Sequence, residues 1–235
     1  MNQLLQYETM KMKTLYVLFL LLTSSHAFTQ QLKWDSTFRP ASYSLKVGQF
    51  KSFANSNNDI IFLGNSITAG TDWNELLGLS NARNRGISGD ITFGVLERLD
   101  EVIEGRPAKV FILIGINDIS RNIPDSVIIS NYRKMVERIQ AGSAATKIYL
   151  QTLLPVNNEF TQFKNHYNKD AHIAYVNAAI RQLAKECKVN LIDLNPNFQD
   201  ANGKLDKKFT EDGLHLDIEG YKVWASILKK GNYLK

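Results

Sequence analysis

The chain has little cysteine and no segment long enough to cross a membrane as a helix. Cys187 is the only cysteine among 235 residues, so an internal disulfide is excluded. Because Cys187 lies on the apolar face of a predicted helix, we expect a buried and unreactive thiol. The apolar run from Thr14 to Leu22 is about half of the roughly 20 residues that a transmembrane helix needs. We therefore expect no membrane span, and the lack of a cysteine after this run argues against a lipid-anchored form.

Charge of one sign is not concentrated in any part of the chain. Lys and Arg total 28 and Asp and Glu total 23, so the net charge is only +5 and the basic residues are scattered. Proteins that bind nucleic acid typically carry basic tracts with interleaved aromatic residues, and the sequence contains none. Nucleic acid is therefore not expected as a partner.

The first 27 residues have the order of a secretory signal peptide. Two lysines precede the apolar run, and small residues follow it at Ser25 and Ala27. A basic segment, an apolar segment and small residues at a cleavage site characterise such signals. We expect cleavage after Ala27, or two or three residues later, and a protein exported to the periplasm or the cell exterior. Met10 and Met12 are alternative starts of the chain.

Apolar strands alternate with amphipathic helices from residue 59 onward. Strands are expected at Asp59 to Gly64, Ala82 to Gly86, Val110 to Gly115, Lys147 to Leu153 and Val189 to Leu194. Apolar residues at helical spacing predict helices in the regions 95–103, 128–139, 173–187 and 218–228. This alternation is typical of a parallel sheet covered on both faces. It predicts an α/β protein with a five-stranded parallel sheet, a three-layer α/β/α sandwich of the flavodoxin-like kind.

The expected domain organisation follows from the same pattern. No linker divides residues 59–235, which are predicted to form one domain after the signal peptide at 1–27. Residues 28–58 form a polar N-terminal extension with a short helix expected from Ser44 to Phe53. The sequence leaves open whether this extension packs beside the functional site or only covers an edge of the sheet.

Four short polar stretches lie at strand ends or just before the last helix. They are GNSIT (64–68), NRGISGD (84–90), GIND (115–118) and DGLH (212–215). Because the carboxyl ends of parallel strands meet in one crevice, we expect Ser66, Gly89 and Asn117 to lie close together. Each stretch also has a purely structural explanation, since Ser66 or Asn117 could cap a helix and Gly89 could form a turn.

Together these residue types match the requirements of ester cleavage. A serine hydroxyl becomes a good nucleophile when an imidazole accepts its proton, and a carboxylate must hold that imidazole in the correct tautomer. Asp212 and His215 are three residues apart, so one turn could join them, unless they form only a loop hydrogen bond. The backbone N–H groups of Ser66 and Gly89 and the Asn117 amide are candidate donors to the oxyanion of the intermediate.

The four stretches resemble the four blocks of the SGNH, or GDSL-type, esterases and lipases, which are named for their Ser, Gly, Asn and His. GNSI in place of GDSL, together with NRGISGDIT and TLLPVN (152–157), resembles the branch with platelet-activating-factor-acetylhydrolase-like and sialate O-acetylesterase-like enzymes. The resemblance covers about residues 59–228. It implies Ser66 as nucleophile, Gly89 and Asn117 as oxyanion donors, Asp212 and His215 as the rest of the triad, and no metal or other cofactor.

The protein is expected to be an exported serine esterase that removes a short acyl group from an O-acylated carbohydrate. Acetyl is the acyl group expected first. A lysophospholipase or small lipid esterase is the alternative among enzymes. A catalytically idle carbohydrate-binding domain is the alternative of another class. An ordinary α/β-hydrolase elbow is disfavoured because Thr68 stands where G-x-S-x-G needs its second glycine. The expected partner is a small-molecule or glycan ester, and the sequence leaves the oligomeric state open.

Several other polar and aromatic residues near strand ends are expected to be structural. Asp90, Asp118 and Asp193 are interpreted as carboxylates that brace loops, because none is tied to a histidine by sequence. The sequence predicts that the imidazoles at positions 166 and 172 are solvated. Trp73 and Phe93 could form a wall of the acyl pocket, although aromatic residues at such places more often belong to the core.

Overall fold

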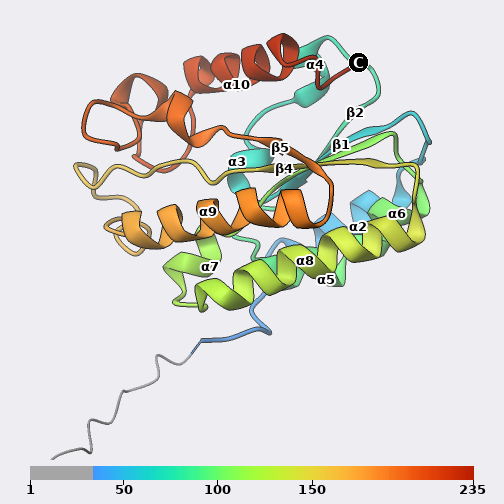
Figure 1. The fold of residues 1–235 in the computed structure, drawn as a ribbon, viewed down its shortest axis with the longest axis horizontal. Helices are drawn as coiled ribbons and strands as arrows, with labels where there is room; N and C mark the ends of the chain where they lie inside the picture. The colour runs from blue at the N-terminus through green and yellow to red at the C-terminus, as the bar shows by residue number, and fades with distance from the viewer. Residues whose placement is uncertain (1–33) are drawn as a thin grey trace, which may run out of the picture. The chain divides into compact units, whose positions relative to one another are not determined.

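Five parallel strands form a single sheet at the centre of the computed structural model, which describes residues 34–235 (Figure 1). The strands are β1 Ile60–Gly64, β2 Ala82–Gly86, β3 Lys109–Leu113, β4 Lys147–Gln151 and β5 Asn190–Ile192, in the spatial order β2-β1-β3-β4-β5. Every residue of β1 and β3 is buried, as expected for strands covered on both faces. The predicted fold class is confirmed.

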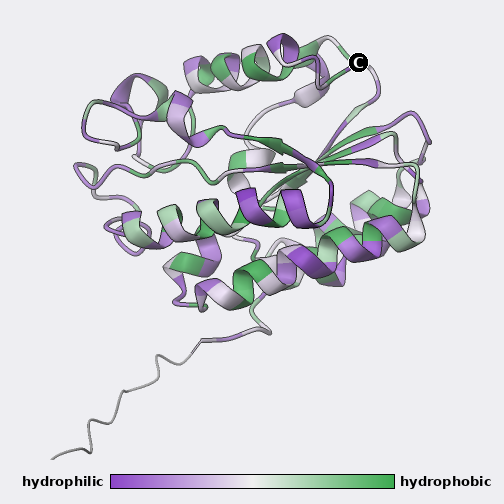
Figure 2. Cartoon of the chain, viewed as in Figure 1, coloured by the Kyte–Doolittle hydropathy of each residue, from purple (hydrophilic) through white to green (hydrophobic). Residues whose placement is uncertain are grey.

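Helices cover both faces of this sheet. The helices are α2 Tyr43–Ser52, α3 Ser66–Ala69, α4 Trp73–Leu77, α5 Thr92–Glu97, α6 Leu99–Glu104, α7 Ile116–Ser120, α8 Asp125–Gly142, α9 Asp170–Glu186 and α10 Ile218–Lys230, with short 3-10 turns η1 Asn195–Phe198 and η2 Lys207–Phe209. α8 and α9 lie on one face, and α10 lies on the other near α4 (Figure 1). Apolar residues follow the strands and stripes of α8 and α9 (Figure 2). Within the predicted region 128–139, α8 buries Ile128, Tyr132, Met135, Val136 and Ile139 together with the polar Asn131.

The order of the strands places a crevice between β1 and β3. From β1 the chain moves to β2 at one edge, whereas from β3 it moves through β4 to β5 at the other edge. In such sheets, ligands bind outside the carboxyl ends of the strands where the chain changes direction. Ser66 lies two residues beyond the end of β1 and Asn117 lies shortly after β3, so both stand at this crevice.

The predicted helix 95–103 is two helices rather than one. α5 ends and α6 begins at Arg98, whose backbone angles of −99° and 9° interrupt the helix. The Arg98 guanidinium is fully buried, donates to the Asp90 carboxylate at 3.1 Å and donates to the Gly64 carbonyl at 3.1 Å. The break accompanies a buried ion pair beneath the end of β1, which helical periodicity alone does not encode.

The structure decides the burial of two side chains, and only Cys187 differs from its prediction. Cys187 lies one residue beyond α9 and is half-buried rather than buried, with its Sγ 3.7 Å from the Arg133 guanidinium. Partial burial raises the pKa of the Cys187 thiol. Trp73 is fully buried and stacks on Phe62 with ring centroids 3.9 Å apart, so it belongs to the core and not to an acyl pocket.

Residues 34–58 pack both beside the crevice and along the sheet edge. Trp34 stacks on Phe93 with centroids 5.9 Å apart, which leaves Phe93 half-buried against this segment. Pro40 is the nearest side chain to Gly89, and Phe50 of α2 lies under the guanidinium of Arg85 on edge strand β2. Residues 34–58 therefore pack beside the functional site as well as against the edge of the sheet, rather than covering the edge alone.

The predicted signal peptide at residues 1–27 lies outside the described residues and stays a prediction. Within residues 34–235, no helix combines the length and apolar character needed to cross a membrane.

Candidate active site

Ser66, His215 and Asp212 form a continuous chain of hydrogen bonds at the carboxyl end of β1. The Ser66 Oγ lies 2.9 Å from His215 Nε2, and His215 Nδ1 lies 2.7 Å from Asp212 Oδ2. An ionised carboxylate only accepts hydrogen bonds, so Nδ1 carries the proton that joins His215 to Asp212. The Nε2 lone pair then faces the serine hydroxyl and can accept its proton.

The Asp212 carboxylate is held by its own loop. Its Oδ1 accepts the backbone N–H groups of His215 at 2.7 Å and of Leu214 at 2.9 Å, which leaves Oδ2 for the imidazole. Partial burial alone would raise the pKa of Asp212, but these hydrogen bonds outweigh it and the pKa lies below its usual value. The carboxylate is therefore ionised at neutral pH, as an orienting group for His215 must be.

Ser66 is free for this role because another residue caps the helix. Ser66 is the first residue of α3, and the Asn65 side chain accepts the Ile67 N–H at 3.0 Å as the cap. Gly64 permits close packing at the end of β1, since an added Cβ would lie 2.2 Å from the Leu113 carbonyl oxygen. The structural alternative for Ser66, that its hydroxyl caps the helix, is not what the structure shows.

The loops that follow β2 and β3 meet at Asn117. The Asn117 Nδ2 donates to the Asp90 carbonyl at 2.9 Å, and Asp90 directly follows Gly89. Gly89 has a φ of +80°, and an added Cβ would lie 3.3 Å from Pro40. A residue with a side chain at position 89 would therefore have a strained backbone conformation and would pack tightly against Pro40. The structure thus brings Gly89 and Asn117, two of the three predicted oxyanion donors, to one corner of the crevice.

Carboxylates near the strand ends brace the loops around the site, two of them buried and one exposed. Burial raises the pKa of Asp90 to about 6, although its ion pair with Arg98 opposes the shift. Burial likewise raises the pKa of Asp118 to about 7, and its carboxylate accepts the Thr92 N–H and hydroxyl. Asp193 pairs with Arg181 at 2.8 Å near the end of β5. The interpretation of these three carboxylates as loop braces is confirmed.

His166 contacts the site, although the sequence suggested a solvated imidazole. Its Nε2 lies 2.9 Å from Asn117 Oδ1, and burial together with nearby His215 lowers the pKa of His166 to about 4. His172, by contrast, is exposed and pairs with Asp125, as predicted for a solvated histidine. Because His166 is 49 residues from Asn117 and belongs to no recognisable motif, only tertiary structure could reveal the contact.

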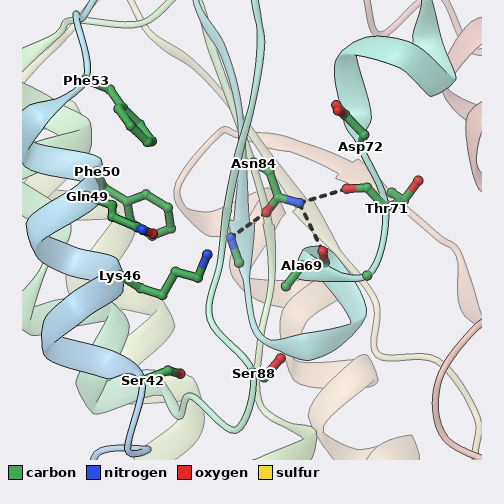
Figure 3. Close-up of a pocket in the computed structure, with 12 residues that line it drawn as sticks. Ser42, Lys46, Gln49, Phe50, Phe53, Ala69, Thr71, Asp72, Asn84 and Ser88 are labelled. Carbon is green, nitrogen blue, oxygen red and sulfur yellow. Dashed lines mark hydrogen bonds between the residues drawn. The ribbon is translucent and has the colours of Figure 1, made fainter.

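Two hollows are lined by residues close in sequence to the site residues, although Ser66 and His215 themselves line neither. A cleft of about 580 Å³ opens between α2, the α3–α4 connection and β2 (Figure 3). Its lining includes Lys46, Phe53, Asn84 and Ser88, and Ser88 is the neighbour of Gly89. In Figure 3, Lys46 extends from α2 toward the strand that carries Asn84.

The second hollow is a small apolar recess of about 10 Å³. Ile67, Ile116 and Leu214 line it, and they are the sequence neighbours of Ser66, Asn117 and His215. A cavity of roughly 10–15 Å³ holds about one water molecule, so this recess has room for a group of methyl size. Across residues 34–235, no group of three or more His, Cys, Asp or Glu side chains is placed to hold a metal ion.

Comparison with known proteins gives consistent matches across this region. Residues 62–223 match the model of the GDSL-like Lipase/Acylhydrolase family. A solved structure of a Streptococcus pneumonia protein, provisionally named a platelet activating factor, superposes with a TM-score of 0.75 at 31% identity, covering 83% of this chain and 93% of that one. Platelet-activating factor acetylhydrolase IB subunit alpha2 of Rattus norvegicus is 27% identical over 169 residues, which cover 69% of this chain and 71% of that one.

A further curated relative is much longer than the matched region. N-acylneuraminate cytidylyltransferase of Streptococcus agalactiae serotype V is 26% identical over 166 residues, which cover 71% of this chain. The match spans only 37% of the length of that relative.

Proposed function

Because this chain belongs to the GDSL-like lipase/acylhydrolase family, we propose that it is a serine ester hydrolase with Ser66 as its nucleophile. The hydrogen-bonded chain from Ser66 through His215 to Asp212 is the observation that carries the proposal. It supplies a nucleophile, a base and an orienting carboxylate within hydrogen-bond distance of one another, which is what acyl transfer requires.

The proposed reaction runs in two steps through an acyl-enzyme. His215 Nε2 accepts the Ser66 proton as Oγ attacks the ester carbonyl, and the oxyanion binds to the N–H groups of Ser66 and Gly89 and to the Asn117 amide. The carbonyl re-forms, the bond to the alcohol breaks, and His215 gives its proton to the departing alkoxide oxygen. Water then attacks the acyl-serine with His215 again as base, which releases the acid and restores Ser66.

The small apolar recess supports acetyl as the acyl group. Its lining joins the neighbours of the nucleophile, the base and the Asn117 donor, and its volume of about 10 Å³ suits one methyl group. An octanoyl chain would have to displace Ile67, Ile116 or Leu214, which are all buried. The word acetylhydrolase in the name of the Rattus norvegicus relative is consistent with this preference.

We expect kcat/KM to fall from p-nitrophenyl acetate to butyrate to octanoate. Ile116→Ala should raise the ratio of butyrate to acetate kcat/KM about tenfold, because one methylene in an apolar pocket is worth roughly 10- to 200-fold. Ile139→Ala, a buried truncation on α8, is the matched control and should leave the ratio unchanged. A wild-type preference for octanoate would instead favour the lysophospholipase or lipid esterase alternative.

The large cleft supports a carbohydrate as the alcohol part of the ester. Its polar lining includes Lys46 and Ser88, and the half-exposed Phe53 offers an aromatic face. A cleft with a few polar groups and an aromatic wall can orient a polyhydroxylated ligand. The curated relative named for N-acylneuraminate, a sugar acid, is consistent with such a substrate, although the chain spans about a third of that protein.

This part of the proposal predicts a substrate-dependent effect of Lys46→Ala. The variant should raise KM for O-acetylated xylo-oligosaccharides about two- to tenfold, because one hydrogen bond typically contributes about 0.5–1.5 kcal/mol. KM for p-nitrophenyl acetate should stay within about twofold, since that ester is too small to reach the cleft. Lys51→Ala on the same helix, whose side chain is exposed and does not line the cleft, is the control. Equal KM values for wild type and Lys46→Ala on the oligosaccharides would count against the cleft as a sugar site.

A further inference from the structure

His166 is held next to the triad loop by two local contacts. Its backbone N–H donates to the Phe163 carbonyl at 2.8 Å and closes a turn. The hydroxyl of the buried Tyr167 accepts the Phe163 N–H at 3.1 Å and donates to the Asp212 carbonyl. The turn that carries His166 is therefore tied to the loop that carries Asp212 and His215.

The contacts of Asn117 define which way its amide faces. The Asp90 carbonyl can only accept a hydrogen bond, so the group 2.9 Å from it must be the Asn117 NH₂. The Asn117 oxygen then faces His166 Nε2 at 2.9 Å, and this nitrogen must be the donor. The Asp90 carbonyl and the His166 imidazole thus form hydrogen bonds with opposite ends of the planar Asn117 amide. One of its two N–H bonds is left for a ligand.

His166 can make this bond without adding charge to the site. Burial lowers the pKa of His166 to about 4, so the imidazole is neutral at pH 7 with its proton on Nε2. Phe163 packs edge-on against both His166 and His215, with centroids 5.9 and 4.9 Å away. Because the His166 imidazole is neutral, it adds no charge next to the His215–Asp212 pair.

We propose that His166 is a positioning residue that orients the Asn117 amide so that its free N–H points to the oxyanion. The inference rests on the proposed function and adds a residue to it. With the Asp90 hydrogen bond alone, the Asn117 amide group could still rotate about its side-chain torsions. Hydrogen bonds at both ends of the amide prevent that rotation. A donor that is already oriented stabilises the oxyanion without reorganisation when charge develops.

Replacement of His166 by Gln or by Met, two side chains of similar length, tests this role. Gln can donate from its amide to Asn117 Oδ1, whereas Met has a similar length and cannot donate. We expect His166→Met to lower kcat on p-nitrophenyl acetate about 10- to 100-fold, less than the roughly 100- to 1000-fold loss of a whole donor. KM should change less than about twofold, and His166→Gln should recover most of kcat. His172→Met, at an exposed histidine, is the control and should match wild type.

A double-mutant cycle with Asn117→Ala separates positioning from any other effect. If His166 acts through Asn117, His166→Met should change kcat less than about twofold when Asn117 is already alanine. An equal loss in both backgrounds, or a His166→Met variant with wild-type kcat, would overturn the proposal.

A second readout does not depend on turnover. The side-chain amide resonances of Asn117, assigned by their absence in Asn117→Ala, should shift in His166→Met and return toward wild type in His166→Gln. Unchanged resonances in the Met variant would refute the contact. Inert wild-type protein with shifted resonances would instead refute the proposed function and retain the contact between His166 and Asn117.

Discussion

Replacement of Ser66 by alanine is expected to lower kcat on p-nitrophenyl acetate by about 10⁵- to 10⁶-fold, the loss typical of a missing nucleophile in a serine hydrolase. The Ser66 Oγ lies 2.9 Å from His215 Nε2, and its removal leaves the base without a proton to accept. The helix cap is supplied by Asn65, so the variant should fold normally. Initial rates of purified wild type and variant, with a thermal melt of each, measure both expectations.

Labelling by a fluorophosphonate gives an independent test of the same prediction. The reagent should modify wild type at Ser66, located by mass spectrometry, and should leave Ser66→Ala unmodified. Ser80→Ala, at an exposed serine outside the crevice, should be labelled like wild type. Wild type that is neither labelled nor active would favour the other class of function, an idle carbohydrate-binding domain.

Asp212→Asn is expected to lower kcat about 10⁴-fold with little change of fold. The reason follows from the two backbone N–H groups on Oδ1, which force the amide oxygen of an asparagine to face them. The amide NH₂ would then face His215 Nδ1, which could only accept. The imidazole proton would move to Nε2, and Nε2 could no longer accept the proton of Ser66.

The measurement is kcat at pH 7–8 for Asp212→Asn beside Asp193→Asn, a carboxylate that pairs with Arg181 away from the triad. The Asp193 variant should keep kcat within about twofold. If Asp212→Asn retained more than about a tenth of wild-type kcat, Asp212 would not be the group that sets the His215 tautomer. Another carboxylate or a water molecule would then have to hold Nδ1.

The sequence alone determined the class of fold and the identity of the triad candidates. Strands buried on both faces must be apolar throughout, and helices against them must be apolar on one stripe, so both can be identified from residue spacing. The pair Asp212 and His215 could also be predicted from the sequence, because the two residues are three apart and one turn can join them. Ser66 and Asn117 could be placed in one crevice because strand ends of a parallel sheet converge.

Tertiary structure alone decided how these groups are oriented and what surrounds them. It assigned the helix cap to Asn65 and the amide orientation of Asn117 to Asp90 and His166. It also placed α2 beside β2 to form the large cleft. Such contacts join residues that are far apart in the chain, and they depend on side-chain direction and hydrogen-bond partners. Periodicity records which face of an element is buried, but it carries no information about which distant residue a polar side chain will meet.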